Sequence, residues 1–563
     1  MRITWFMPLL LAAVGAAQQA PPKPAIVEGT VVNSVTREPV RKTDLTLVTS
    51  LLNDEAEKVM AQFMGGLDEP SAPGASKPPK KSYSATTDAM GKFHFEVEAG
   101  DYYLKATRAT FGDVIYKPEG KFALEGKVHL QPGDELKDVV IRMVPQGAIS
   151  GRVIDEDGDP VGNAMVSAEK YAYDSGHRLL IPADTAQAND RGEFRLGKLP
   201  PGRYYVMAST GINPSAMMQA PPPAPKDGSP EMGYVRTYYP KATDVAAAGT
   251  IDVAAGADLP GFVITLQKSH VVRVKGKALD TDGTPLKTGM IMLMAGVDPG
   301  SMRMQMLADP QGRFEIANVA PGTYMITTMQ MSGASPTMHM QTLVVPEDGV
   351  KDVLLGGQTD GTVQGRVGVD GDGKVALQTV RIMMGGGSSA PSMPVFAAVS
   401  EAGEFALKKV APAPYEISVQ SVPAGAYVKS VRWDNKEKLG QTLDFSSGFG
   451  GKLEITLATD GGQFEAVVTR DGKPAGEATV VLIPSDPALR CEVTTHESDS
   501  DSAGNVTFRD VAPGRYLAFA WEDVEQGAWL DPVFLKPLES LGAAVTIEPK
   551  AHEKVELKLI PAK

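Results

Sequence analysis

The chain has 563 residues, too many for one hydrophobic core, and this length predicts roughly three to five domains of about 100–200 residues each. The 55 lysines and arginines are outnumbered by 68 aspartates and glutamates, and no basic block offsets the net charge of −13, which argues against nucleic acid and anionic membrane surfaces as partners. The 58 glycines and 43 prolines, without a collagen-like period, indicate many tight turns between short strands.

Residues 1–20 have the order of a Sec signal peptide: Arg2, an apolar run from Ile3 to Val14, and small residues up to Ala17. The run is shorter than the roughly 20 residues that span a bilayer, and no later stretch reaches that length without a charge or a turn residue. We therefore expect no transmembrane segment and an exported protein that is periplasmic, at the cell surface or secreted. The single cysteine, Cys491, cannot form an internal disulfide and is expected to be a strand residue.

One pattern, D-x-x-G-x-F followed by P-G-x-Y, recurs at a period of about a hundred residues, which is typical of a domain array. The first copy runs from Gly91 to Tyr102 and is one residue shorter than the others. The fourth copy has Ala413 in place of the second glycine, and the fifth has Val506 in place of the phenylalanine. The other repeated residues are Gly192, Phe194, Gly202, Tyr204, Gly312, Phe314, Gly322, Tyr324, Gly403, Phe405, Tyr415, Gly504, Gly514 and Tyr516.

Each position of the pattern has a structural explanation, shown here for the third copy. The turn from Asp309 to Gly312 needs a positive φ angle, which glycine tolerates. The alternation that follows places Phe314 and Ile316 on one face of a half-buried strand. The Ala-Pro-Gly turn that ends at Gly322 then reverses the chain again.

Short strands with Asp/Gly turns precede each copy, as in G-R-V-I-D-E-D-G-D-P-V at Gly151, and two more strands follow it, as in V-T-I-E-P-K-A-H-E-K-V-E-L-K-L at Val545. The unit is then about seven short antiparallel strands, enough for a two-sheet sandwich. The fold class predicted is all-β, a linear array of about five such sandwiches after a signal peptide. The expected boundaries are 1–20 for the signal peptide, then 21–146, 147–268, 269–358, 359–459 and 460–563 for the sandwiches.

Three insertions interrupt this pattern. Residues 51–64 have near-helical spacing of apolar side chains and predict a helix within the Pro-rich insertion of the first sandwich. Residues 211–233 and 384–395 are rich in Pro, Gly, Ser and Met and predict mobile loops.

The motifs D-G-x-P-(V/L), D-x-x-G-x-F and P-G-x-Y resemble the carboxypeptidase regulatory-like domain, a transthyretin-like (prealbumin-like) sandwich, and are similar to collagen-adhesin B-type repeats and starch-binding-like sandwiches. The resemblance implies a non-catalytic module. None of the seven histidines is followed by glutamate at the third position, so a zinc carboxypeptidase site is not expected, and H-E-x-x-H and G-x-S-x-G are also absent. We expect no enzymatic activity, no catalytic residue, no cofactor and no catalytic metal.

Methionines gather in the third repeat, with 11 of the 25 between residues 290 and 340. Two interpretations stay open, because methionine fills irregular cores and its thioether is also a soft ligand for Cu(I). Met290, Met292 and Met294 alternate with Ile291 and Leu293, which favours a strand buried on both faces. The better copper candidates are then Met302, Met304 and Met306.

Acidic turns and aromatic residues offer two further candidates. The turns at Asp155 and Asp370 are similar to calcium loops, but Pro160 stands where an EF-hand needs glycine, which favours hairpin turns. Exposed aromatic rings bind sugars by stacking, and the carbohydrate candidates are Trp433, Trp521, Trp529, Tyr238 and Tyr239. The repeat tyrosines are expected to hold the fold instead.

These observations predict a non-enzymatic, exported modular binding or scaffold protein that presents loops for protein or glycan contact at the cell envelope. The expected partners are polysaccharide or cell-envelope proteins. One alternative is a carbohydrate-binding protein with a starch-binding-like fold, and a second is a periplasmic Met-rich copper-binding protein.

Overall fold

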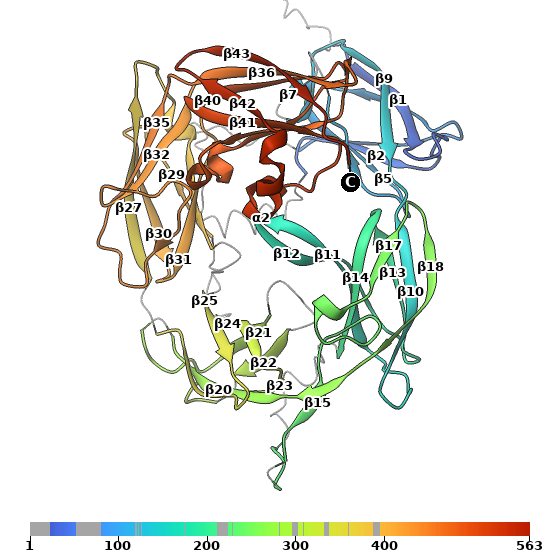
Figure 1. Cartoon of the computed structure of the whole chain (residues 1–563), viewed down its shortest axis with the longest axis vertical. Helices are drawn as coiled ribbons and strands as arrows, with labels where there is room; N and C mark the ends of the chain where they lie inside the picture. The colour runs from blue at the N-terminus through green and yellow to red at the C-terminus, as the bar shows by residue number, and fades with distance from the viewer. Residues whose placement is uncertain are drawn as a thin grey trace, which may run out of the picture. The chain divides into compact units, whose positions relative to one another are not determined.

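The protein is described from a computed structural model that covers residues 23–51 and 80–562, except for 119–120, 122, 125, 175, 211–222, 228, 281, 296–301, 308, 331–336, 358–359 and 387–393. The chain divides into two compact units, the first ending at Gln146 and the second running from Gly147 to Lys563. Most of the regular secondary structure of both units is β-strand (Figure 1). The predicted helix at 51–64 lies outside the described residues, apart from Leu51 at its start.

The first unit is one two-sheet sandwich. Its apolar residues alternate along each strand, so that Phe93, Phe95 and Val97 enter the core while Lys92, His94 and Glu96 face water. The three-stranded sheet contains β4 (Lys92–Val97), β1 (Ala25–Asn33) and β9 (Glu135–Met143). The other sheet contains β3 (Ser82–Thr86), β2 (Asp44–Val48), β5 (Gly100–Thr107), β8 (Lys127–Leu130) and β7 (Ala123–Leu124), with β6 (Val114–Ile115) on β5.

The second sandwich repeats this plan at the start of the second unit. Its first sheet contains β13 (Glu193–Leu199), β10 (Gly147–Ile154) and β18 (Asp258–Thr265). Its second sheet contains β12 (His177–Gln187), β11 (Ala164–Asp174), β14 (Gly202–Thr210), β16 (Thr237–Tyr238) and β17 (Thr250–Val253). A short 3-10 helix, η3 (Val245–Ala247), and a separate ribbon of β15 (Met232–Tyr234) and β19 (Lys268–His270) complete this part.

The third and fourth sandwiches follow with the same two layers. The third has β23 (Arg313–Val319), β20 (Val272–Ala278) and β26 (Val350–Leu355) in one sheet, and β22 (Arg303–Leu307), β21 (Gly289–Met294), β24 (Gly322–Gln330) and β25 (Thr337–Val345) in the other. The fourth has β30 (Glu404–Val410), β27 (Gly361–Asp370), β35 (Leu453–Ala458), β32 (Tyr427–Trp433) and β33 (Lys436–Glu437), facing β29 (Val395–Ala398), β28 (Arg381–Gly385), β31 (Pro414–Gln420) and β34 (Leu443–Asp444), with η5 (Leu377–Thr379) as a connector.

The fifth sandwich adds a helical segment to the plan. One sheet contains β37 (Lys473–Pro474), β36 (Gly462–Arg470), β40 (Asn505–Val511) and β43 (His552–Lys558), and the other contains β39 (His496–Asp499), β38 (Thr479–Pro484), β41 (Gly514–Trp521) and β42 (Ala543–Ile547). The short helices are η6 (Pro487–Leu489), η7 (Glu492–Thr494), η8 (Ala528–Leu530), α2 (Pro532–Leu535) and η9 (Lys536–Leu541). The last three lie between β41 and β42.

The all-β array of sandwiches is confirmed, but the strands are not all antiparallel. In every sandwich the opening strand pairs in parallel with the closing strand, as β1 does with β9 and β36 does with β43. The closing strand follows a strand of the opposite sheet, so it enters by a crossover and not by a hairpin. A crossover allows the parallel direction that a tight hairpin forbids.

The repeated glycines and tyrosines hold the two turns of each copy. Gly312 has a φ of 72°, and a Cβ placed on it would lie 2.4 Å from the Ala278 carbonyl oxygen of the opening strand. The tyrosine hydroxyl donates to the carbonyl four residues earlier, over 2.6 Å from Tyr204 to Pro200 and 2.7 Å from Tyr516 to Ala512. In the fourth copy, where alanine replaces glycine, the Tyr415 hydroxyl instead accepts from the Ala411 N–H. These residues therefore close turns within the fold.

Candidate functional site

The segment between the second and third sandwiches is a compact polar region. The ribbon of β15 and β19 places Tyr234 directly opposite Lys268, whose ammonium nitrogen lies 5.0 Å from the centre of the tyrosine ring. The Lys268 nitrogen is also 3.9 Å from a Glu156 carboxylate oxygen, and the Glu156 carboxylate accepts the backbone N–H of Lys268. The Tyr234 hydroxyl and the nearby carboxylates raise the pKa of Lys268. The ribbon is thereby tied to the second sandwich.

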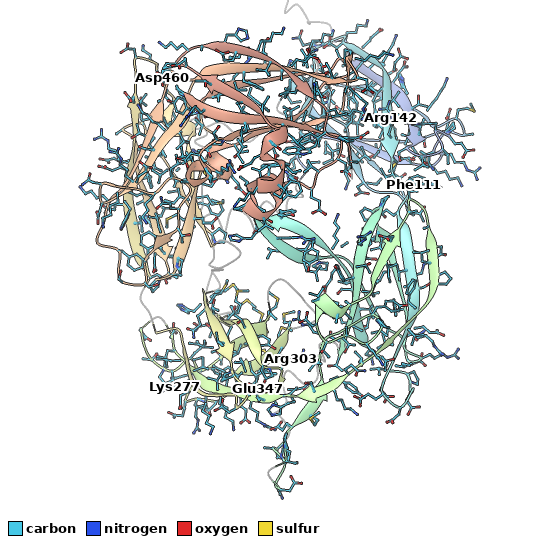
Figure 2. The ribbon with its side chains drawn as sticks, viewed as in Figure 1. Phe111, Arg142, Lys277, Arg303, Glu347 and Asp460 are labelled. Carbon is cyan, nitrogen blue, oxygen red and sulfur yellow. The ribbon has the colours of Figure 1, made fainter. Side chains whose placement is uncertain are left out.

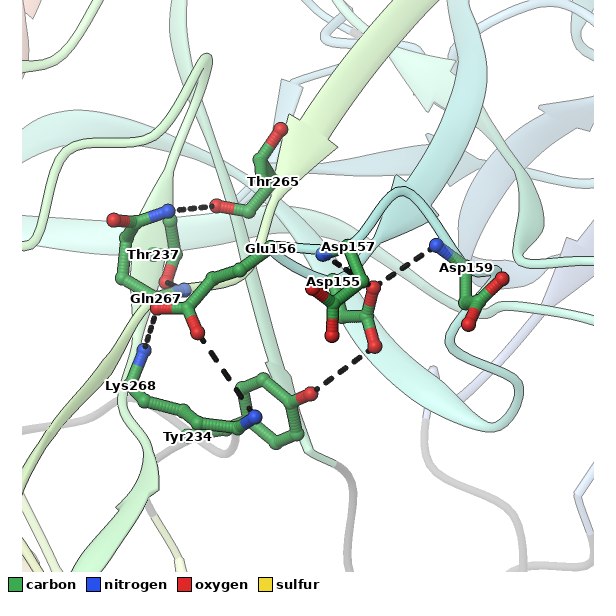
Figure 3. A network of polar contacts seen from close by, with 9 residues as sticks. All are labelled: Asp155, Glu156, Asp157, Asp159, Tyr234, Thr237, Thr265, Gln267 and Lys268. Carbon is green, nitrogen blue, oxygen red and sulfur yellow. Dashed lines mark hydrogen bonds and ion pairs between the residues drawn. The ribbon is translucent and has the colours of Figure 1, made fainter.

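The acidic turn at Asp155 belongs to the same network (Figure 3). One oxygen of the Asp155 carboxylate accepts the backbone N–H groups of Asp157 and Asp159, at 3.0 and 2.9 Å, and the other lies 3.5 Å from the Tyr234 hydroxyl. This arrangement is that of a self-bonded hairpin turn. At the second acidic turn, the Asp370 carboxylate pairs with Lys429 at 2.5 Å, and this hydrogen bond lowers the pKa of Asp370.

Arg273 of β20 forms the other side of this region. Its guanidinium, 11 % exposed, donates to Glu231 at 2.6 Å and to Glu315 at 2.7 Å. Burial raises the pKa of Glu315, but the hydrogen bonds and charges of Arg273 and Lys275 outweigh burial and lower it overall. The hydrogen bond to Glu231 raises the pKa of Arg273. Because Glu231 directly precedes β15 and Glu315 lies on β23, the cluster fixes the ribbon to the third sandwich.

The polar region around the ribbon of β15 and β19 therefore joins the second sandwich to the third, and its charged side chains pair with one another. No group of three or more His, Cys, Asp or Glu residues that could hold a metal ion occurs within the described part of the chain. The same residues include no helix long and apolar enough to cross a membrane.

Two of the carbohydrate candidates, Trp521 and Trp529, lie inside a second core of the fifth sandwich. Trp521 stacks on Phe519, with ring centres 4.8 Å apart and planes 9° apart, and it also stacks with Trp529, with ring centres 6.3 Å apart and planes 17° apart. Both tryptophans are 3 % exposed. Trp521 Nε1 is buried without a hydrogen-bond partner. These rings present no open face for a sugar, because the segment from η8 to η9 supplies side chains that cover them.

The other three candidates are also packed against protein. Tyr238 is buried, with its hydroxyl 3.5 Å from the Glu169 carboxylate, and Tyr239 meets the Phe262 ring edge-on at 5.2 Å. Trp433 is half-buried and meets Phe445 edge-on at 5.1 Å. The five residues come from three different sandwiches, and only Trp521 and Trp529 lie against each other. A sugar site at the half-buried rings of Trp433 and Tyr239 stays a prediction.

Glu169 is a feature that the sequence analysis missed. It is 2 % exposed on β11 and accepts a hydrogen bond from the Ser167 hydroxyl at 2.8 Å. The signal was the alternation along β11, where Val166 and Ala168 enter the core and Ser167 and Glu169 point to the opposite face. The alternation predicts that the polar residues on that face are exposed to solvent. In the structure, the chain around β16 covers them, and the Tyr238 hydroxyl lies 3.5 Å from the Glu169 carboxylate.

The Met-rich strand β21 differs from its prediction. Ile291 and Leu293 are fully buried, but Met290, Met292 and Met294 are only half-buried and do not form a second buried face. Arg303 (labelled in Figure 2) and Gln305 point toward the other sheet, where Arg303 donates to the Asn318 carbonyl at 3.4 Å and Gln305 accepts from the Glu315 N–H at 3.1 Å. Met304 and Met306 therefore lie on the same outer face as the methionines of β21.

The repeated two-sheet plan, with its parallel opening and closing strands, defines a tandem array of β-sandwiches. Residues 148–216 match the carboxypeptidase regulatory-like domain family. The matched segment belongs to the second sandwich. The resemblance predicted from the motifs is confirmed there.

The chain is similar to several known proteins at low sequence identity. Colossin-A of Dictyostelium discoideum is 23 % identical over 253 residues, which are 44 % of this chain and 2 % of that protein. The chain thus spans a small fraction of that relative's length. The Bacillus anthracis TIE protein aligns over 74 % of this chain and 73 % of its own, with 10 % identity and a TM-score of 0.16. A streptococcal ancillary pilin aligns over 59 % and 99 %, with 15 % identity and the same TM-score.

Proposed function

We propose that the protein is a non-enzymatic, exported modular scaffold that presents binding surfaces at the cell envelope. The observation that supports this proposal is how the repeated residues are used. The glycines, phenylalanines and tyrosines of the pattern form turns and cores, as Gly312, Phe314 and Tyr204 do. What varies between copies lies on outer sheet faces and in connecting loops, the places where such folds acquire function.

The joint between the second and third sandwiches supports a scaffold role in particular. A linker free of contacts would let neighbouring modules rotate. Here the ribbon of β15 and β19 is bonded to Asp155 and Glu156 on one side and to Arg273 on the other. Such a joint favours modules that are held at a fixed spacing.

A binding screen of residues 21–563 tests the proposal. The chain is assayed by affinity electrophoresis against soluble polysaccharides, and by pull-down with insoluble polysaccharides and with cell-envelope extracts whose retained proteins are identified by mass spectrometry. A scaffold role predicts reproducible retention of the same envelope proteins or glycan. Turnover of any peptide, ester or glycoside substrate by the purified chain would contradict it.

Glycan binding is tested in the same screen with two variants. Trp433 is half-buried and Trp529 is buried, so the structure favours Trp433 of the two as a sugar contact. If a glycan is retained through these rings, Trp433→Ala weakens retention with little effect on folding, whereas Trp529→Ala unfolds the second core of the fifth sandwich. Retention unchanged by Trp433→Ala excludes that ring as the site.

A further inference from the structure

The outer face of one sheet in the third sandwich is built of methionine. In β21 the residues Ile291 and Leu293 enter the core, so that Met290, Met292 and Met294 point the opposite way. In β22 the buried Leu307 sets the same alternation, which directs Met304 and Met306 outward. The two strands therefore present five thioethers on one face.

The neighbouring strands extend this face in register. Met290 lies opposite Met306 of β22 and opposite Met329 of β24, which in turn lies opposite Met338 of β25. This row crosses all four strands of the sheet. A second row beside it contains Met304, Met292, Thr327 and Met340, and a third contains Met294 and Met325. We call this surface the methionine face, and its members are Met290, Met292, Met294, Met304, Met306, Met325, Met329, Met338 and Met340.

The methionine face is accessible. Met306 is 42 % exposed and the other eight are half-buried, and none of the nine belongs to the buried core of the third sandwich. Thr327, in the middle of the second row, is only 4 % exposed, since it lies between Met292 and Met340. The long side chains thus form a layer over the sheet.

Core packing does not explain this choice of residue. A half-exposed strand face is usually formed by polar or β-branched side chains. Methionine has three rotatable bonds and a polarizable thioether, so its presence at nine neighbouring positions supplies mobile sulfur donors and not a fixed shape. Directly opposite side chains on adjacent strands have Cβ atoms about 4.5–5.5 Å apart, which lets neighbouring sulfurs converge on one ion.

We propose that the methionine face is a binding site for a soft monovalent metal ion, Cu(I), held by the thioether sulfurs of adjacent members of the row Met306, Met290, Met329 and Met338. Thioethers prefer Cu(I), whereas Ca²⁺ and Mg²⁺ need oxygen ligands. The other outward positions of β24 and β25 are Thr323, Thr327, Thr342 and Val344, none of which is a carboxylate. The site is independent of the scaffold role, because it uses no residue of the joint or of the repeated turns. Its most exposed member, Met306, belongs to the stretch that the sequence favoured for copper, and the structure adds the three strands that complete the row.

The test is a Cu(I) competition assay on residues 21–563 under anaerobic, reducing conditions, with bathocuproine disulfonate as the competing chelator. The unsubstituted chain is expected to withdraw Cu(I) from the chelator. A variant with Met290→Leu, Met306→Leu, Met329→Leu and Met338→Leu keeps the apolar volume and should fold. Loss of ligands should weaken Cu(I) binding by about tenfold or more, since loss of outer-shell partners alone costs that much.

A matched control removes the same number of thioethers from separate places. Met90, Met165, Met232 and Met383 are exposed or half-buried and lie on other sandwiches or ribbons. Their joint replacement by leucine should leave Cu(I) affinity unchanged. The proposal is overturned if the unsubstituted chain takes no Cu(I) from the chelator, if the row variant binds as well as the unsubstituted chain, or if the control variant loses as much affinity as the row variant.

Discussion

Corresponding sheets of the third and fifth sandwiches differ in their outer faces: the outer face is covered by other residues in the fifth sandwich and is partly exposed in the third. Strands β22, β21, β24 and β25 correspond in order to β39, β38, β41 and β42. In the fifth sandwich the outward residues Val481, Phe519 and Trp521 form a second core with Trp529 and Leu535 of the helical segment. In the third sandwich most outward residues of these strands are methionines, of which Met306 is exposed and the others are half-buried. The repeats therefore share their inner face, which fixes the fold, and differ on the outer face, where each copy can acquire a separate role.

Replacing Trp521 with alanine should have the largest effect. The ring is buried against Phe519 and Trp529, so its removal leaves a cavity and should cost about 3–5 kcal/mol of unfolding free energy in the fifth sandwich. The matched change on the other surface, Met292→Ala, should cost only about 1 kcal/mol because that side chain is half-buried. Hydrogen-exchange mass spectrometry in urea reports each sandwich separately. Equal losses would mean that the two surfaces are covered alike.

The shared inner architecture is tested at the repeat glycine. Gly312→Ala should cost about 2–3 kcal/mol, since the positive φ disfavours alanine and the added Cβ would lie 2.4 Å from the Ala278 carbonyl oxygen. Gly283 is the control, with a similar φ of 79° but no atom within 4 Å of its Cβ position, and there alanine should cost about 1 kcal/mol. The unfolding free energies of both variants are measured by urea denaturation, followed by hydrogen exchange in β20 and β23. The explanation fails if the two variants are equally stable.

Replacing the tyrosine at the second turn should destabilise the fold less than replacing the glycine at the first turn. Tyr204→Phe removes a hydroxyl that donates to the Pro200 carbonyl at 2.6 Å and should cost about 1 kcal/mol. The adjacent Tyr205 is half-buried and points to the other face, so Tyr205→Phe serves as the control and should be close to neutral. A measurable loss in Tyr205→Phe equal to that in Tyr204→Phe would rule out the turn hydrogen bond as the cause.

These buried tyrosines also predict a loss of stability in alkali. Burial raises the pKa of Tyr516 to about 12, above the ordinary value of about 10. A raised folded-state pKa contributes stability below pH 10, and this contribution disappears as the pH rises through the folded value. The unfolding free energy of the fifth sandwich should therefore fall between about pH 10 and pH 12. Tyr516→Phe should flatten that part of the profile, and an unchanged slope in the variant would contradict this assignment.

The smallest effect is expected in acid at the joint between the second and third sandwiches. The pKa of Glu315 is lowered overall by Arg273 and Lys275, so its contribution to stability is present above the ordinary glutamate value and is lost as the pH falls through the folded one. The stability of the Glu315→Gln variant should therefore depend less on pH between pH 6 and pH 3 than that of the unsubstituted chain. Exchange rates in β20 and β23 measured between pH 6 and pH 3 in both chains provide the comparison.

The sequence predicted the parts of this fold that depend on local chemistry. Asp309, Gly312 and the Ala-Pro-Gly turn fix where the chain reverses, and the alternation at Phe314 fixes which side chains are buried. The parallel pairing of β1 with β9 could not be predicted from local residues. Strand direction there depends on a crossover between the two sheets, and no local turn residue specifies that crossover.

The candidate sites were harder to predict for a related reason. A period of two assigns residues to two faces but does not say whether the second face is covered. Met292 and Trp521 occupy such faces, and the sequence placed the first in a core and the second at a surface. What decides each case is the segment that packs above it: residues 522–542 cover Trp521, whereas Met292 is still half-exposed in the described structure.

The most direct test of the account is therefore the accessibility of these two outer faces. Brief oxidation of residues 21–563 with dilute peroxide, followed by peptide mass spectrometry, reports sulfoxide formation at each methionine. The account predicts that Met290, Met304 and Met306 oxidise at rates approaching that of the isolated, exposed Met232, while the fully buried Met143 and Met207 are protected. Protection of the methionine face equal to that of Met207 would contradict the claim that this outer face is open.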